Sequence, residues 1–127
     1  MGYTIKNLES VEDMAKQHGL SDQGEARFAG GALDAVQTGV SHQRLHPGKR
    51  QQFGHHHNQA EEIYVVLAGS GRVKLDEEIL ELGKLDAIRV SPETMRAFEA
   101  GDEGLEILAF GQHFGGDGEI VPDWWSD

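Results

Sequence analysis

The histidines of this chain are concentrated in one short segment. Five of the seven lie between residues 42 and 57, namely His42, His46, His55, His56 and His57. Alternate side chains of an extended strand point to the same face, so His55 and His57 share a face that His56 does not. Two imidazoles on one face, followed by a carboxylate on the next strand, can bind a divalent metal facially. Glu61 and Glu62 both stand where that carboxylate is needed.

Strands must position these side chains, and a period of two runs through the chain from about residue 25. Short apolar–polar alternations end in turn residues, which is typical of an all-β sandwich or small barrel. The most apolar segment, 62–69, is expected to be a central strand, and Tyr64 and Phe98 are expected in the core rather than in catalysis. The predicted strands are 25–29, 35–46, 51–57, 61–68, 71–75, 78–82, 86–90, 95–99 and 104–110.

Two segments lie outside the strand pattern. Residues 8–20 are expected to form a helix with Ser10 as its N-cap. The last segment is rich in glycine and ends near Trp124 and Trp125. Adjacent tryptophans are costly to leave in water. We therefore expect this tail to pack on the barrel or on a partner subunit, with a lid over a pocket as the alternative.

The composition excludes several classes of function. Lys and Arg total 11 and Asp and Glu total 22, which gives a formal charge of −11. Such a surface repels nucleic acids and anionic membranes, so neither is an expected partner. Because cysteine is absent, disulfides, iron–sulfur clusters and thiol nucleophiles are excluded. No signal-peptide core and no membrane-spanning apolar run is present, so we expect a soluble, cytoplasmic protein.

The segment 47–71, PGKRQQFGHHHNQAEEIYVVLAGSG, resembles the first motif of the cupin superfamily. Four residues separate His57 from Glu62, and six separate Glu62 from Gly69, as in that motif. The resemblance implies that Glu62, and not Glu61, is the carboxylate ligand. It also implies a jelly-roll β-barrel, the double-stranded β-helix. The expected parts of this single domain are a helix and strand extension at 1–30, a cupin barrel at 31–112 and a C-terminal tail at 113–127.

The second cupin motif matches residues 85–100 in spacing and strand pattern only. Its signature positions carry other residue types, namely Leu85, Ser91, Glu93 and Ala100. Arg96 stands where the motif has its metal-binding histidine. Arginine stays protonated at any relevant pH and offers no lone pair, so Arg96 cannot be a fourth ligand.

Arg96 leaves three arrangements open. In the first, His55, His57 and Glu62 hold a metal, and Arg96 contacts an anionic ligand beside it. In the second, no metal is bound and Arg96 forms an ion pair with Glu62. In the third, Arg96 points outward and another histidine completes the site, the candidates being His42, His46 and His113.

A pocket of His55, His57, Glu62 and Arg96 is consistent with two functions. One is an enzyme that binds a divalent ion (Fe, Mn, Ni or Zn) and a small anionic or polar molecule, since small cupins include oxygenases and isomerases. The alternative is a metal-free module that binds or senses a small molecule without catalysis. The resemblance also implies a homodimer, with contacts from the N-terminal segment and the tail.

Overall fold

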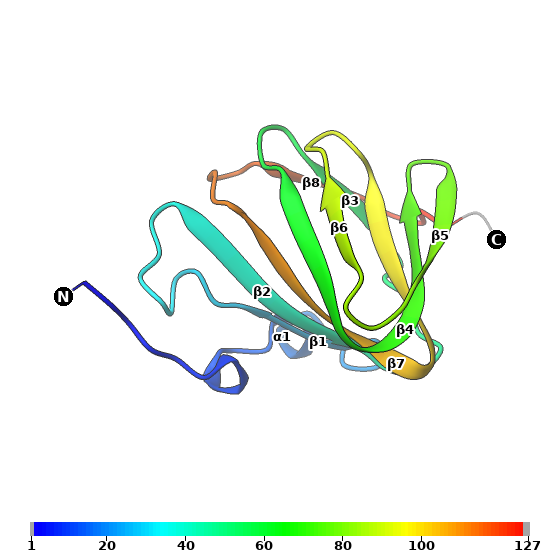
Figure 1. The fold of residues 1–127 in the computed structure, drawn as a ribbon, viewed down its shortest axis with the longest axis horizontal. Coiled ribbons are helices and arrows are strands. Elements are labelled where there is room, and N and C mark those ends of the chain that lie inside the picture. The colour runs from blue at the N-terminus through cyan, green and yellow to red at the C-terminus, as the bar shows by residue number, and fades with distance from the viewer. Residues whose placement is uncertain (1, 126–127) are drawn as a thin grey trace.

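The computed structural model describes residues 2–125 and contains one sheet that curls around a core (Figure 1). A 3-10 turn (Leu8–Ser10) and a short helix, α1 (Met14–Gln17), precede the strands. The strands are β1 (Gly24–Phe28), β2 (Thr38–Leu45), β3 (Gly54–His57), β4 (Glu62–Leu75), β5 (Glu78–Leu82), β6 (Ala87–Val90), β7 (Arg96–Gln112) and β8 (Gly118–Val121). The predicted all-β jelly-roll barrel with a short N-terminal helix is confirmed.

The sheet brings strands together that lie far apart in the sequence. Its order is β1-β2-β7-β3-β8, and β4 pairs with β5, β6 and β7. Through its pairings with β2, β3 and β4, the long strand β7 connects the two sides of the curled sheet (Figure 1). The ligand-bearing strands β3 and β4 therefore both lie against β7.

β4 and β7 each join two of the predicted strands. The breaks expected between those strands are irregularities in the pairing of β4 and β7 instead, and there Gly69 and Gly104 have φ angles of 77° and 81°. A Cβ on Gly69 would lie 2.0 Å from the Gly104 carbonyl oxygen, so only glycine fits at this crossing. Glycine thus bends the two strands without ending them.

The predicted helix at 8–20 is wrong in extent, because the chain forms two separate turns there. Asn7 caps the 3-10 turn, and Asp13 caps α1 by accepting a hydrogen bond from the Ala15 N–H. Ser10 is not a cap, since its hydroxyl donates to the Asn7 carbonyl oxygen. Asp13 also accepts from the Ala26 N–H in β1, which turns the segment back onto the sheet. Within residues 2–125, no helix is long and apolar enough to cross a membrane.

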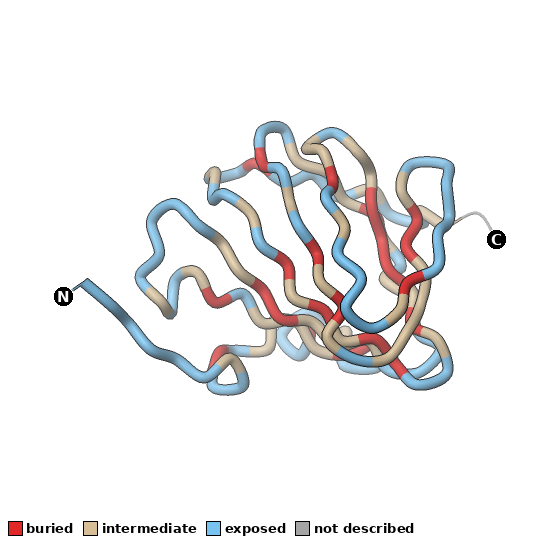
Figure 2. Tube along the Cα trace, in the orientation of Figure 1, coloured by how far each residue is buried: buried red, intermediate tan, exposed pale blue. Residues whose placement is uncertain are grey.

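The core is made mainly by β4 and β7, along which buried positions recur (Figure 2). Tyr64, Val66 and Val73 on β4 face Phe98 and Ile107 on β7, and each is at most 2 % exposed. The Tyr64 and Phe98 rings lie 4.8 Å apart between centroids. This packing fixes the position of β4, whose first residue is Glu62.

The C-terminal tail packs on the barrel through both tryptophans. Trp124 lies against Gly54, where a Cβ would come within 2.7 Å of its ring. The Lys74 ammonium donates to the Trp124 carbonyl oxygen at 2.8 Å and lies 4.2 Å from the centre of its ring. The Trp125 indole N–H donates to the Gln51 carbonyl oxygen at 2.6 Å. These contacts hold β8 beside β3, and β8 is a strand that the sequence pattern did not predict.

Candidate metal centre

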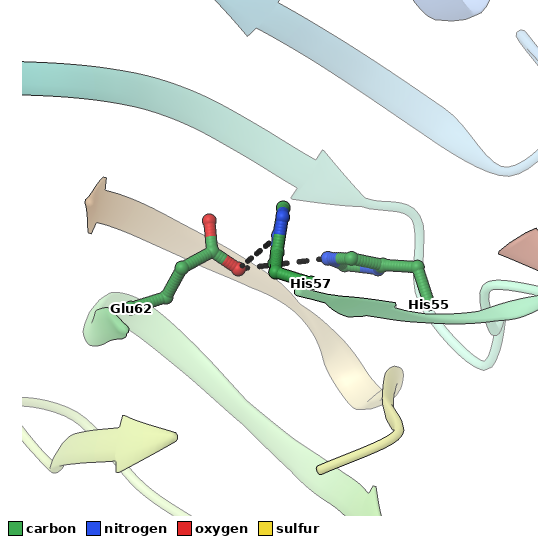
Figure 3. Close-up of side chains that lie close together, drawn as sticks. All are labelled: His55, His57 and Glu62. Atoms are coloured by element: carbon green, nitrogen blue, oxygen red, sulfur yellow. Dashed lines mark hydrogen bonds and ion pairs between the residues drawn. The ribbon is translucent and has the colours of Figure 1, made fainter. Parts of the chain in front are cut away.

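Three predicted ligands come together on β3 and at the start of β4 (Figure 3). Their donor atoms all lie within 4.8 Å of one another. His57 Nε2 is 3.1 Å from Glu62 Oε1, and His55 Nε2 is 3.6 Å from the same oxygen. All three side chains are half-buried. The alternation of β3 places both imidazoles on its inner face, as the His-x-His spacing predicts.

Glu62 Oε1 is the point where the polar side chains of the site meet. The Tyr64 hydroxyl donates to it at 2.5 Å, and the same hydroxyl lies 3.5 Å from His55 Nε2. Burial raises the pKa of the Glu62 carboxyl, but its polar contacts with His55, His57 and Tyr64 outweigh burial and hold that pKa well below its usual range. The carboxylate is therefore charged at neutral pH.

Tyr64 has a larger role than the core residue expected from the sequence. Its side chain is buried, but its hydroxyl reaches the candidate ligand Glu62. Burial and the charge of Glu62 raise the pKa of this hydroxyl well above its ordinary value, so it remains a hydrogen-bond donor. The residue type was consistent with this contact, because a buried tyrosine needs a partner for its hydroxyl.

Arg96 points into the barrel and lies directly opposite His55 in the register of β3 and β7. Its side chain is 0 % exposed, and Nη1 is 3.2 Å from Glu62 Oε1. Nη2 donates to the Ser91 carbonyl oxygen at 2.7 Å. The third arrangement, in which Arg96 points outward, is therefore wrong. The guanidinium supplies positive charge beside Glu62 on the side where the second cupin motif has its histidine.

Asp117, which the sequence did not single out, holds the loop that follows His57. Its carboxylate accepts hydrogen bonds from the backbone N–H groups of Asn58, Gln59 and Ala60, the loop between His57 and β4. Its Oδ2 also lies 3.3 Å from His57 Nδ1, although the geometry is not that of a hydrogen bond. Burial raises the pKa of Asp117, but the three backbone donors outweigh it and lower that pKa. No sequence signal marks this residue, because it lies about sixty residues from the loop it holds.

Two cavities meet at His57 and Glu62. The larger has a volume of about 490 Å³ and is also lined by His55 and Tyr64. The smaller, of about 360 Å³, reaches toward Asp117 and is lined in part by glycines of β2, β7 and β8. The candidate ligands thus lie in the wall of a space that a small molecule can enter.

The donor set fits a divalent metal. Ligand atoms about 2.1 Å from a common ion are roughly 3 to 3.5 Å apart in tetrahedral or octahedral geometry. The measured distances of 3.1 and 3.6 Å from Glu62 Oε1 to the two imidazole nitrogens are close to that range. Two imidazoles and one carboxylate form a facial set that suits Fe, Mn, Ni or Zn.

The comparisons with known proteins agree with this geometry. A family model described as Cupin domain matches residues 41–111, more than half of the chain. The chain belongs to the cupin family. No curated protein matches this cupin at a significant level.

Solved structures share the cupin fold at low sequence identity. A cupin protein from Bacteroides fragilis has a TM-score of 0.73 and 24% identity over 91% of this chain and 88% of that chain. An oxalate decarboxylase from Bacillus subtilis has a TM-score of 0.75 and 21% identity over 93% of this chain and 33% of that chain. A sugar phosphate isomerase from Silicibacter pomeroyi has a TM-score of 0.70 and 16% identity over 94% of this chain and 92% of that chain.

The remaining histidines of this cupin lie outside the ligand cluster. His42 Nε2 on β2 lies 2.6 Å from the carboxylate of Glu106 on β7, and His46 Nε2 lies 3.2 Å from the Ser21 carbonyl oxygen. His56 points away from His55 and His57 toward Glu119, as predicted. His113 lines only the smaller cavity. Among the described residues, the metal-ligand cluster therefore contains His55, His57 and Glu62 without a fourth histidine.

Proposed function

We propose that this cupin is a metal-dependent enzyme that acts on a small molecule with a polar or anionic head. The observation that carries the proposal is the convergence of His55, His57 and Glu62 in the wall of the larger cavity. When bound there, a divalent ion with open positions supplies Lewis acidity or, with a redox metal, dioxygen chemistry. The family and its fold support such a role, since an oxalate decarboxylase and a sugar phosphate isomerase share this architecture.

In this proposal the other polar residues position the ligands. The Tyr64 hydroxyl fixes the orientation of the Glu62 carboxylate, and Asp117 fixes the loop that follows His57. Arg96 is our proposed source of attraction for an anionic head. Because its side chain is fully buried, its effect reaches the cavity through the electrostatic potential and across Glu62, not by a direct hydrogen bond.

A metal-free binding module is the second candidate, and one contact favours it. Arg96 Nη1 already lies 3.2 Å from Glu62 Oε1, so a positive charge stands beside the carboxylate before any ion binds. In this reading Arg96 replaces the charge of the metal. The two candidates differ in one measurable property, the affinity for divalent ions.

Metal binding by the untagged protein, purified without a nickel column, tests the proposal. We expect about one Fe, Mn, Ni or Zn ion per chain and its loss in the double variant His55→Ala/His57→Ala. The matched control, His46→Ala/His56→Ala, removes two histidines outside the cluster and should keep the metal. No bound metal in the wild type after incubation with each ion would refute the enzyme proposal and favour the binding module.

We also propose that the chain forms the homodimer expected from the sequence. Tyr3 and Ile5 in the N-terminal segment are 70% and 86% exposed, and a partner would cover them. Trp124 and Trp125 already contact their own barrel, so the N-terminal segment is the stronger candidate contact. Light scattering at micromolar protein should give twice the mass of the chain, and a monomer mass would contradict the dimer.

A further inference from the structure

The larger cavity has walls of a different chemistry from the ligand cluster. Beyond His55, His57 and Glu62, its lining includes six large apolar side chains: Met14, Leu20, Phe28, Leu45, Phe53 and Ile120. These residues come from α1, the turn between α1 and β1, β1, β2, the segment before β3, and β8. The cavity therefore has a polar end at the ligands and apolar walls leading away from them.

Two of these side chains are unusually exposed for their size. Phe28 is 58% exposed and Ile120 is 66% exposed. They lie on β1 and β8, the two ends of the strand path β1-β2-β7-β3-β8. Exposed large apolar side chains that line one cavity mark a binding surface more often than scattered ones do. A ligand between them would cover apolar surface that the fold leaves in water.

The charges of the same walls do not suit an anionic body. Among residues 2–125, Arg44 is the one lysine or arginine in the lining of this cavity, and it lies 3.1 Å from Glu106 and 3.8 Å from Glu25. Glu25 and Glu119 add two carboxylates to the walls, and each has a partner outside the lining, Arg27 at 2.6 Å and His56 at 3.0 Å. The guanidinium of Arg96 lies outside the lining. A phosphate or a second carboxylate placed along these walls would therefore meet no lysine or arginine that lacks a carboxylate partner.

We propose that the substrate has an apolar body, aromatic or alkyl, behind a head with two metal-chelating oxygens. This inference rests on the proposed function, because the head needs the ion held by His55, His57 and Glu62. The chelating head lies at the polar end of the cavity, and the body packs between Phe28, Phe53 and Ile120. Sugar phosphates and short dicarboxylic acids lack such a body and bind weakly.

Three hydroxamates test the inference, because they share one chelating head and differ only in the body. They are acetohydroxamate (a methyl body), benzohydroxamate (an aromatic body) and succinate monohydroxamate (a carboxylate body). Each is titrated by calorimetry into Co²⁺-loaded protein. We expect benzohydroxamate to bind at least about tenfold more tightly than acetohydroxamate. Succinate monohydroxamate should bind no more tightly than acetohydroxamate.

Variants locate the body in the cavity. Phe28→Ala and Phe53→Ala should each reduce the preference for benzohydroxamate several-fold while acetohydroxamate affinity stays unchanged. Phe28 is more than half exposed, so its variant should fold normally. Ile63→Ala is the matched control, since Ile63 is an exposed apolar residue outside the cavity lining.

The possible results separate this inference from the proposed function. Equal binding of acetohydroxamate and benzohydroxamate overturns the inference while the proposed function stands. A preference for succinate monohydroxamate does the same. A preference for benzohydroxamate that survives both phenylalanine variants places the body elsewhere and also overturns it. Failure of all three compounds to bind the Co²⁺-loaded protein overturns the proposed function, an enzyme whose metal has open positions. The inference is then overturned as well.

Discussion

The two motif regions of this barrel lie on neighbouring strands of one sheet but carry opposite chemistry. Residues 54–69 place His55, His57 and Glu62 at the positions where cupin ligands are expected. Residues 85–100 bring Arg96 to the adjacent strand β7, in register with His55 on β3. The same backbone frame thus holds electron-pair donors on one strand and a fixed cation on its neighbour. Family spacing therefore predicts where a side chain lies, whereas its residue type decides what that side chain does.

The largest effect is expected from Glu62→Gln, because Glu62 is the partner that both regions share. Removing its charge takes a ligand from the first region and leaves the Arg96 guanidinium buried without a counter-charge. We expect metal affinity to fall by at least about 100-fold and the free energy of unfolding of the metal-free protein to fall by about 3 kcal/mol. Metal titration and urea unfolding measure the two effects. Unchanged stability would show that the Arg96–Glu62 contact contributes little.

Arg96→His converts the second region to the chemistry of the first. The variant adds an imidazole donor and removes a positive charge near the ion, so metal affinity should rise about tenfold. Calorimetry with Zn²⁺ measures the change. The control is Arg89→His, because Arg89 is an exposed arginine of β6 that contacts Glu61 outside the site. An unchanged or lower affinity in Arg96→His would mean that position 96 does not reach the ion.

Asp117→Asn tests how the first region is held. The amide keeps an acceptor for the backbone of the loop but loses the charge that faces His57 Nδ1. We expect metal affinity to fall about tenfold, which is typical of residues that orient a ligand. Asp86→Asn is the matched control, since Asp86 accepts from the Gly83 N–H at an exposed turn. Equal metal affinity in both variants would remove Asp117 from the site.

The smallest effect is expected at Asp13, which lies in neither motif region. Asp13→Asn should reduce the free energy of unfolding by about 1 kcal/mol or less and leave metal affinity unchanged. Burial raises the pKa of Asp13, but hydrogen bonds from the Ala26, Ala15 and Lys16 N–H groups outweigh it and lower that pKa below 3.8. A carboxyl group whose pKa is lowered by folding stabilises the fold at pH values above its pKa in the unfolded chain. This stabilisation is lost as the pH falls through the folded-state pKa. Below about pH 4 the wild type should therefore lose stability relative to the variant. Parallel pH profiles of the free energy of unfolding would contradict a stabilising role for the Asp13 carboxylate.

Much of this molecule could be predicted from its sequence because local patterns encode it. Alternation predicted most of the strands, and the spacing of His55, His57 and Glu62 predicted their convergence. The strand β8 was missed because a short, glycine-flanked segment has little pattern of its own and depends on β3 for its pairing.

The other misses have separate physical reasons. Asp117 acts on a loop far away in the sequence, so no local spacing reveals it. The hydroxyl of Tyr64 reaches Glu62 only because the two side chains point inward from the same strand. The inward direction of Arg96 was left open because its residue type favoured solvent, whereas its strand position favoured the core.

A crystal structure of the metal-loaded protein, with anomalous diffraction at the absorption edge of the bound metal, tests the central claim most directly. We predict one anomalous peak within about 2.3 Å of His55, His57 and Glu62, with the Arg96 guanidinium still in contact with Glu62. A peak elsewhere would contradict the account. So would the absence of a peak, with both imidazoles still in contact with Glu62 Oε1. The barrel would then be a metal-free binding module centred on the Arg96–Glu62 pair.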